Sequence, residues 1–151
     1  DHGVDKTLLS YNIETDEILN TCDLGSILIS KWTNKLKIGI ELYDGHKEYY
    51  SNLLHAAFPS SKKILFVNRG VDISRPLSAQ NDCFWWGYHG LSKISEPYYN
   101  FKRIVRGYDP QKTGPQNNTL VCSLYKGSGF DGQVVGGLFS TSGDIIDIFE
   151  A

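Results

Sequence analysis

The chain has no methionine, few cysteines and no long apolar run. Its longest uninterrupted apolar stretches, such as Ile64–Val67, are about four residues, whereas a bilayer-spanning helix needs roughly 18 to 20. No positively charged segment precedes an apolar core of the kind that marks a targeting peptide. The sequence therefore predicts neither a transmembrane segment nor membrane insertion by this domain.

The three cysteines, Cys22, Cys83 and Cys122, are too widely spaced for a paired zinc-ligand motif or a dense disulfide scaffold. At most one disulfide is possible, and buried free thiols on strands are the simpler expectation. The four histidines are also scattered, with no His-x-x-x-His or Cys-x-x-Cys pair. We therefore expect no metal and no cofactor.

Length and charge are those of one soluble globular domain. The 151 residues include 15 Lys and Arg and 17 Asp and Glu, giving a net charge of −2. We expect a single domain over residues 1–151, and because the chain begins with Asp1 we expect it to be excised from a longer protein. The near-neutral balance also argues against nucleic acid as the partner.

Apolar alternation predicts two N-terminal hairpins, one over residues 9–22 and one over residues 26–43. The short apolar run Ile64–Val67 predicts a strand that is covered on both faces. The further expected strands are Cys83–His89, Tyr98–Tyr108, Thr119–Tyr125, Gln133–Ser140 and Asp144–Phe149, with a turn at residues 141–143 between the last two.

One segment has a helical period. Between His46 and Phe58 the apolar residues recur at i, i+3, i+4, i+7 and i+8; they are Tyr50, Leu53, Leu54, Ala57 and Phe58. Asp44 or Gly45 can cap the start of this helix, and Pro59 ends it. The predicted fold class is α+β, with a mostly antiparallel sheet that wraps a single central helix at about residues 46–58.

Motifs of known chemistry are weak. The segment Gly127–Val134 matches the glycine spacing of dinucleotide and kinase loops, but the helix or the downstream lysine strand that those loops require does not follow. There is no Gly-x-Ser-x-Gly nucleophile motif, and Asn117-Asn118-Thr119 is a glycosylation sequon of a kind that is common by chance. We therefore expect no enzymatic activity.

Aromatic and basic side chains are interleaved in the middle of the chain. Residues 62–112 carry nine basic and four acidic groups, and the stretch Cys83–Gly90 contains Phe84, Trp85, Trp86, Tyr88 and His89. These rings either fill the core or form a platform that stacks on a sugar face while polar neighbours bind its hydroxyl groups. The candidate ligand-binding residues are Trp85, Trp86, Tyr88, His89, Tyr98, Tyr99 and Arg103.

A helix at His46–Phe58 among strands, in a fragment of 151 residues rich in Ile, Asn and Tyr, resembles the distal head domain of a rotavirus outer-capsid spike protein of the group B type. Better-known rotavirus spike heads are galectin-like β-sandwiches, and the helix departs from that pattern, so no site residue is transferred. The resemblance implies recognition of host cell-surface glycans, of the galactose or N-acetyllactosamine type, at the virion surface. It also implies the remainder of the spike protein as a partner, structural thiols and an unused sequon at Asn117.

The sequence thus favours a non-enzymatic carbohydrate-binding domain for host-cell attachment. Two alternatives belong to other classes. The aromatic patch can instead bind a partner protein, in which case sugars have no role. The chain can also be a small hydrolase whose active-site residues are dispersed in the sequence and meet only in space.

Overall fold

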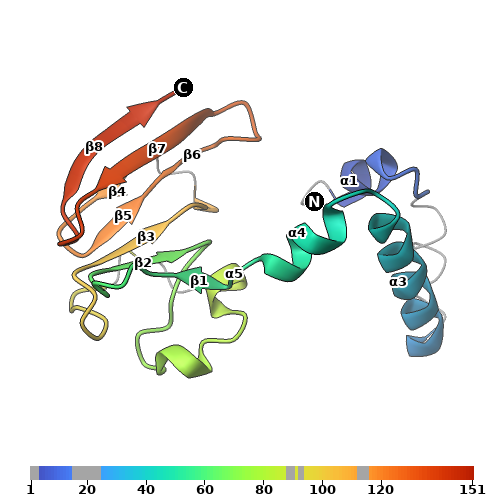
Figure 1. Cartoon of the computed structure of the whole chain (residues 1–151), viewed down its shortest axis with the longest axis horizontal. Coiled ribbons are helices and arrows are strands. Elements are labelled where there is room, and N and C mark those ends of the chain that lie inside the picture. The colour runs from blue at the N-terminus through green and yellow to red at the C-terminus, as the bar shows by residue number, and fades with distance from the viewer. Residues whose placement is uncertain (1–3, 15–24, 88–90, 92–93, 112–115) are drawn as a thin grey trace. The chain divides into compact units, whose positions relative to one another are not determined.

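The computed structural model describes residues 4–14, 25–87, 91, 94–111 and 116–151. The chain divides into two compact units, residues 1–53 and residues 54–151, and each is described by itself (Figure 1). The expectation of a single globular domain stays a prediction. The predicted strand at residues 17–22, Cys22 and the candidate residues Tyr88 and His89 lie outside the described residues.

The described part of the first unit is helical. It contains α1 (Val4–Ser10), α3 (Ser26–Glu41) and α4 (His46–Asn52). The predicted hairpin over residues 26–43 is wrong, because α3 occupies that segment, and α1 replaces the start of the hairpin predicted at residue 9.

The alternation that suggested strands does not match the buried face of α3. Ile38 and Leu42 belong to the alternating series, yet they are 63% and 81% exposed. The less exposed positions of the helix are 32, 33, 36, 39 and 40, which is a helical spacing, with Trp32 buried. The alternation of Leu36, Ile38, Ile40 and Leu42 is therefore a coincidence and does not mark the buried face of a strand.

The helix predicted over His46–Phe58 begins as expected but ends early. Gly45 is its N-cap and has a left-handed φ of 77°, which glycine adopts without strain. Leu53 is already extended, and Ala56–Ala57 form strand β1, which pairs antiparallel with the next strand. Pairing across the sheet thus overrides the helical period of the last residues.

The second unit contains a five-stranded sheet in the order β1-β2-β3-β5-β4. Its strands are β1 (Ala56–Ala57), β2 (Ile64–Val67), β3 (Arg103–Arg106), β5 (Val121–Ser123) and β4 (Gln116–Asn117). The three inner strands, β2, β3 and β5, run parallel, and the two outer strands run antiparallel to their neighbours.

Both faces of the parallel strands are covered. Along β2, Ile64 lies in one apolar cluster and Leu65 in another on the opposite face, and β3 repeats the division with Val105 and Ile104. Parallel strands are stable in this double-sided environment. The predicted strand Ile64–Val67, covered on both faces, is confirmed.

A three-stranded antiparallel sheet covers one face. It consists of β6 (Tyr125–Lys126), β7 (Gln133–Phe139) and β8 (Ile145–Glu150), which together form the curved outer layer in Figure 1. Phe139 of β7 meets Phe66 of β2 edge to face, with ring centroids 5.8 Å apart. The turn predicted at residues 141–143 is confirmed.

The segment from Asn68 to Lys102, which crosses from β2 to β3, supplies most of the core on the opposite face. It contributes Val71, Phe84, Leu91, Ile94, Tyr98 and Phe101 to that core. It contains the 3-10 turn η1 (Leu77–Ala79) and the short helix α5 (Cys83–Trp86). The predicted strand Cys83–His89 is therefore wrong over its described part, and the predicted strand Tyr98–Tyr108 is shortened to β3.

The α+β class is confirmed, but the predicted architecture is wrong. The described residues hold four α-helices rather than one, and the centre of the larger sheet is parallel rather than antiparallel. Cys122 is a buried free thiol on β5, as predicted, whereas Cys83 is free but half-buried and lies on a helix rather than a strand.

The glycine-rich segment that resembled a phosphate loop is the hairpin between β6 and β7. A Cβ added at Gly132 would overlap the backbone of Lys126 and Gly127, whereas one added at Gly107 would meet nothing within 4 Å. The loop is therefore shaped by close backbone packing.

We expect Gly132→Ala to lower the free energy of unfolding by about 1–3 kcal/mol, because the backbone must move to admit the methyl group. Gly107→Ala is the matched control and should change it by no more than about 0.5 kcal/mol. Urea denaturation of both variants measures the difference, and equal stabilities would contradict the steric role.

A buried ion pair lies beyond the end of β3. Arg106 Nη2 and Asp109 Oδ2 are 2.7 Å apart, and both side chains are almost fully buried. Burial lowers the pKa of Arg106, and the Asp109 carboxylate acts in the opposite direction. Arg106 Nε also donates to Ser123 Oγ at 3.1 Å, which links β3 to β5.

Asp109→Ala should destabilise the chain by about 3–5 kcal/mol, since it leaves the guanidinium charge buried without its carboxylate. Lys126→Ala removes an exposed ion pair with Glu150 and should cost at most about 1 kcal/mol. Thermal unfolding of the two variants tests this order, and a smaller loss for Asp109→Ala would refute it.

Candidate functional site

The five described candidate residues, Trp85, Trp86, Tyr98, Tyr99 and Arg103, do not share one exposed surface. Trp86, on α5, is 62% exposed, whereas Trp85 is half-buried, packs against the core and meets the ring of His55 at a centroid distance of 6.2 Å. Tyr98 and Arg103 are buried, at 4% and 8% exposed. Of the described candidates, Trp86 and Tyr99 present exposed rings.

Arg103 joins secondary-structure elements to one another. Its Nε donates to the carbonyl oxygen of Gly143, in the turn between β7 and β8, at 3.0 Å. Its Nη1 donates to Asn117 Oδ1 at 3.1 Å and to the carbonyl oxygen of Asn118. The guanidinium therefore ties the outer sheet and the loop after β4 to β3.

Tyr99 separates two hollows on the surface of the second unit. The first, of about 400 Å³, is lined by Ile73, Ser74, Arg75, Pro76, Glu96, Pro97, Tyr98 and Tyr99. The second, of about 590 Å³, is lined by Phe58, Lys62, Pro76, Leu77, Ser78, Tyr99, Asn100 and Phe101. Pro76 and Tyr99 belong to both linings, so these two residues form a shared ridge, which we call the Tyr99 ridge.

The backbone at this ridge is strained. Among the described residues, the non-glycine residues with positive φ are Asn12, Lys62, Asn81, Tyr99 and Asp131. Asn and Asp tolerate the left-handed region, but Lys and Tyr rarely adopt it. Lys62 (φ 50°) and Tyr99 (φ 54°) are thus the two unusual cases, and both line the second hollow. Strain of this kind is concentrated at functional sites in proteins.

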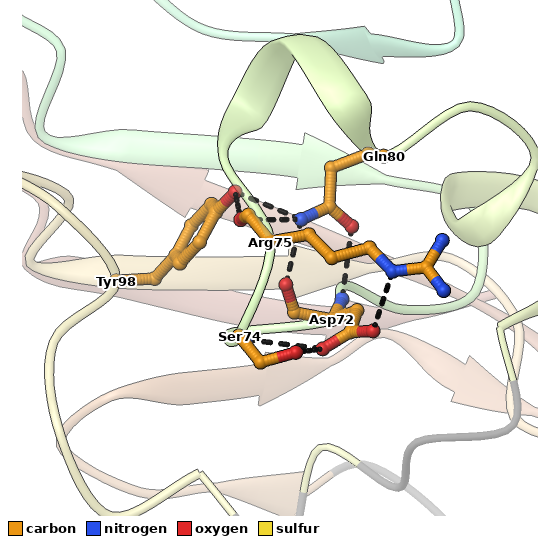
Figure 2. A network of polar contacts seen from close by, with 5 residues as sticks. All are labelled: Asp72, Ser74, Arg75, Gln80 and Tyr98. Carbon is orange, nitrogen blue, oxygen red and sulfur yellow. Dashed lines mark hydrogen bonds and ion pairs between the residues drawn. The ribbon is translucent and has the colours of Figure 1, made fainter.

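The loop that forms the other side of the ridge is held by the buried side chain of Gln80 (Figure 2). Gln80 Oε1 accepts from the backbone N–H of Asp72 at 2.9 Å, and Nε2 donates to the carbonyl oxygen of Asp72 at 2.7 Å. Nε2 also donates to the hydroxyl of Tyr98 at 2.8 Å and lies 3.0 Å from the carbonyl oxygen of Arg75. The amide thus fixes the loop from Asp72 to Arg75 as regular backbone pairing would.

Asp72 completes this network. One carboxylate oxygen accepts from the backbone N–H of Ser74 at 3.0 Å and from the Ser74 hydroxyl at 2.6 Å. The other lies 3.1 Å from Arg75 Nε. Ser74 and Arg75 are therefore fixed in place at the first hollow (Figure 2).

Packed rings support the ridge from below. The rings of Tyr98 and Tyr99 meet edge to face at 4.8 Å, and Tyr98 stacks near Phe101 at 6.4 Å. Phe58, which is 43% exposed, packs against Phe101 at 5.7 Å. The exposed ring of Tyr99 thus packs on the buried ring of Tyr98, which in turn lies near Phe101.

The sequence predicted Tyr98 and Tyr99 as site residues but not the other residues that line the two hollows. Phe58 falls in the helix predicted over residues 46–58, and Asn100 falls in the strand predicted over Tyr98–Tyr108. No short-range signal marks Gln80, whose role depends on residues up to 18 positions away.

The site places several hydrogen-bonding side chains beside an aromatic ring. An exposed phenol ring lies between hydroxyl, amide, carboxylate and cationic side chains. Among the described residues, no three His, Cys, Asp or Glu side chains are grouped so that they could hold a metal ion. Within the same residues, no helix is long and apolar enough to cross a membrane.

Tyr98→Phe should lower the free energy of unfolding at neutral pH by about 1–3 kcal/mol, because the hydroxyl accepts from Gln80 and donates to the carbonyl oxygen of Arg75 at 2.8 Å. Tyr99→Phe is the matched control and should have no comparable effect. Equal destabilisation by the two changes would show that the buried hydroxyl has no special role.

Alkaline pH gives a second test. Burial raises the pKa of Tyr98, so the folded chain holds this proton more tightly than the unfolded chain does. This contribution to stability is complete below about pH 10 and is lost as the pH rises through the raised value. Urea denaturation at neutral and alkaline pH should therefore show a smaller alkaline loss for Tyr98→Phe than for the unmodified chain. An identical loss of stability in the two proteins would contradict the contribution of Tyr98 to the alkaline pH dependence.

Comparison with known proteins gives no relative from which a function can be transferred. No protein-family model matches the chain, and neither does any curated protein or any solved structure. Its function must therefore be inferred from the side chains and the geometry of the Tyr99 ridge.

Proposed function

We propose that the chain is a non-enzymatic carbohydrate-binding domain and that it binds sugar at the Tyr99 ridge. The observation that carries the proposal is the conformation of Tyr99. Its ring is 60% exposed, its backbone is left-handed and it stands between two hollows. Folding alone does not require a large aromatic residue at a strained and exposed position.

The side chains around the ring match the chemistry of a sugar. A pyranose has an apolar face of C–H groups, which packs on an aromatic ring, and a rim of hydroxyl groups. Ser74, Arg75 and Glu96 beside the first hollow, and Ser78 and Asn100 beside the second, offer donors and acceptors to such hydroxyls. Small-ligand sites combine these two features.

Pre-organisation supports the same proposal. The Gln80 network fixes the loop that carries Ser74, Arg75 and Pro76, and the ring of Tyr99 packs on the buried ring of Tyr98. Little loop freedom is then lost when a ligand binds, which matters for a weak, shallow site. Affinity in the millimolar range, about −4 kcal/mol, becomes useful when many copies bind together.

The resemblance to the rotavirus spike head extends the proposal to a biological role. The ligands are then host cell-surface glycans of the galactose or N-acetyllactosamine type, and the domain acts in attachment at the virion surface as part of a larger spike protein. Avidity from many spikes on one particle, roughly 10² to 10⁴, compensates for the weak single site.

The first experiment is a glycan array with the 151-residue chain displayed multivalently. We expect selective binding to galactose-terminated or lactosamine chains. A blank array, with folding confirmed and a high display density, would contradict the proposal and favour the protein-binding alternative.

A substitution at the ridge tests the site itself. Tyr99→Asn removes the ring and places a residue that tolerates a left-handed backbone, so the free energy of unfolding should change by less than about 1 kcal/mol. Glycan affinity should nevertheless fall by about tenfold or more. Trp86→Ala is the control, since Trp86 is exposed but lines neither hollow, and it should leave binding unchanged. Loss of glycan binding in Trp86→Ala, with binding retained in Tyr99→Asn, would instead place the site at α5.

A further inference from the structure

The two hollows beside Tyr99 are neighbours that differ in character. Pro76 and Tyr99 line both, so a ligand that lies on the ridge has access to each side. Arg75 and Glu96 line the first hollow, which therefore offers charged hydrogen-bonding groups. Phe58, Leu77 and Phe101 make the second hollow more apolar than the first, although Lys62, Ser78 and Asn100 also line it.

Neither hollow is a closed pocket around the ring. Tyr99 is 60% exposed and Phe58 is 43% exposed, although both lie beside space that a ligand can fill. A single sugar unit in one hollow would leave the wall of the other in water. A longer ligand would remove both walls from water and would use the ring of Tyr99 at its centre.

We infer that the ligand is an oligosaccharide with at least two adjacent sugar units that lie across the Tyr99 ridge, one in each hollow. This inference rests on the proposed function. The more hydroxylated unit occupies the first hollow, beside Arg75 and Glu96, and the unit with the more apolar surface occupies the second, beside Phe58 and Leu77. The unlike walls give the bound chain one direction across the ridge.

Each hollow also has side chains of its own. Glu96 lines the first hollow and not the second, whereas Phe58 and Ser78 line the second and not the first. A change at one of these unshared residues tests its subsite separately.

NMR titration of the 151-residue chain measures how the affinity depends on the number of sugar units and on the side chains of each hollow. The probes are galactose, N-acetylglucosamine and the disaccharide N-acetyllactosamine. The variants are Glu96→Ala for the first hollow, Phe58→Ala for the second, and Ser78→Phe, which fills the second hollow from an exposed position without altering the core. Tyr99→Asn serves as the variant without the ridge.

The disaccharide should bind at least tenfold more tightly than either monosaccharide. Glu96→Ala should lower the affinity for the disaccharide at least fivefold, and so should each change in the second hollow. The affinity for any one monosaccharide should fall on changing one hollow or the other, but not both. If Phe58→Ala does not fold, Ser78→Phe gives the same comparison.

Three results would overturn the inference. Equal affinity of the disaccharide and one monosaccharide would show that a single unit fills the site. Weakening of one monosaccharide by changes in both hollows would show one subsite rather than two. Failure of all three sugars to perturb signals near Tyr99 would overturn the proposed function together with the inference, and so is distinguishable from the first two results.

Discussion

The second unit depends on one constraint, which is that β2, β3 and β5 run parallel and are buried on both faces. Parallel neighbours cannot be joined by a tight turn, because the chain must return to the starting edge of the sheet. The chain between β2 and β3 therefore has to be long, and it occupies residues 68–102. The same segment covers one face of the sheet with Phe84, Tyr98 and Phe101.

This long connection also carries most of the candidate site. Its described part has little regular structure, so the backbone polar groups there need other partners. The side chain of Gln80 supplies several of them and holds Asp72, Arg75 and Tyr98 within one network. One buried amide thus gives an irregular loop the rigidity that a binding surface requires, and it does so beside the strained backbone of Tyr99.

Local patterns predicted the strands better than the helices. The strands β2, β7 and β8 were predicted because short apolar or β-branched runs bounded by turns are typical of strands. Residues 26–41 were mistaken for strands because Leu36, Ile38 and Ile40 also alternate with polar residues. Phe84, Trp85 and Trp86 were assigned to a strand, but they belong to a four-residue helix that buries Phe84 and leaves Trp86 exposed.

The sequence by itself determined the α+β class, the double-sided burial of β2 and the concentration of aromatic and basic residues in the middle of the chain. Only the tertiary structure decided which of those residues face solvent. Tyr98 and Tyr99 are adjacent and chemically identical, yet one is buried against Gln80 and the other is exposed. In an irregular segment no period relates position to face, so contacts with residues distant in the sequence make that choice.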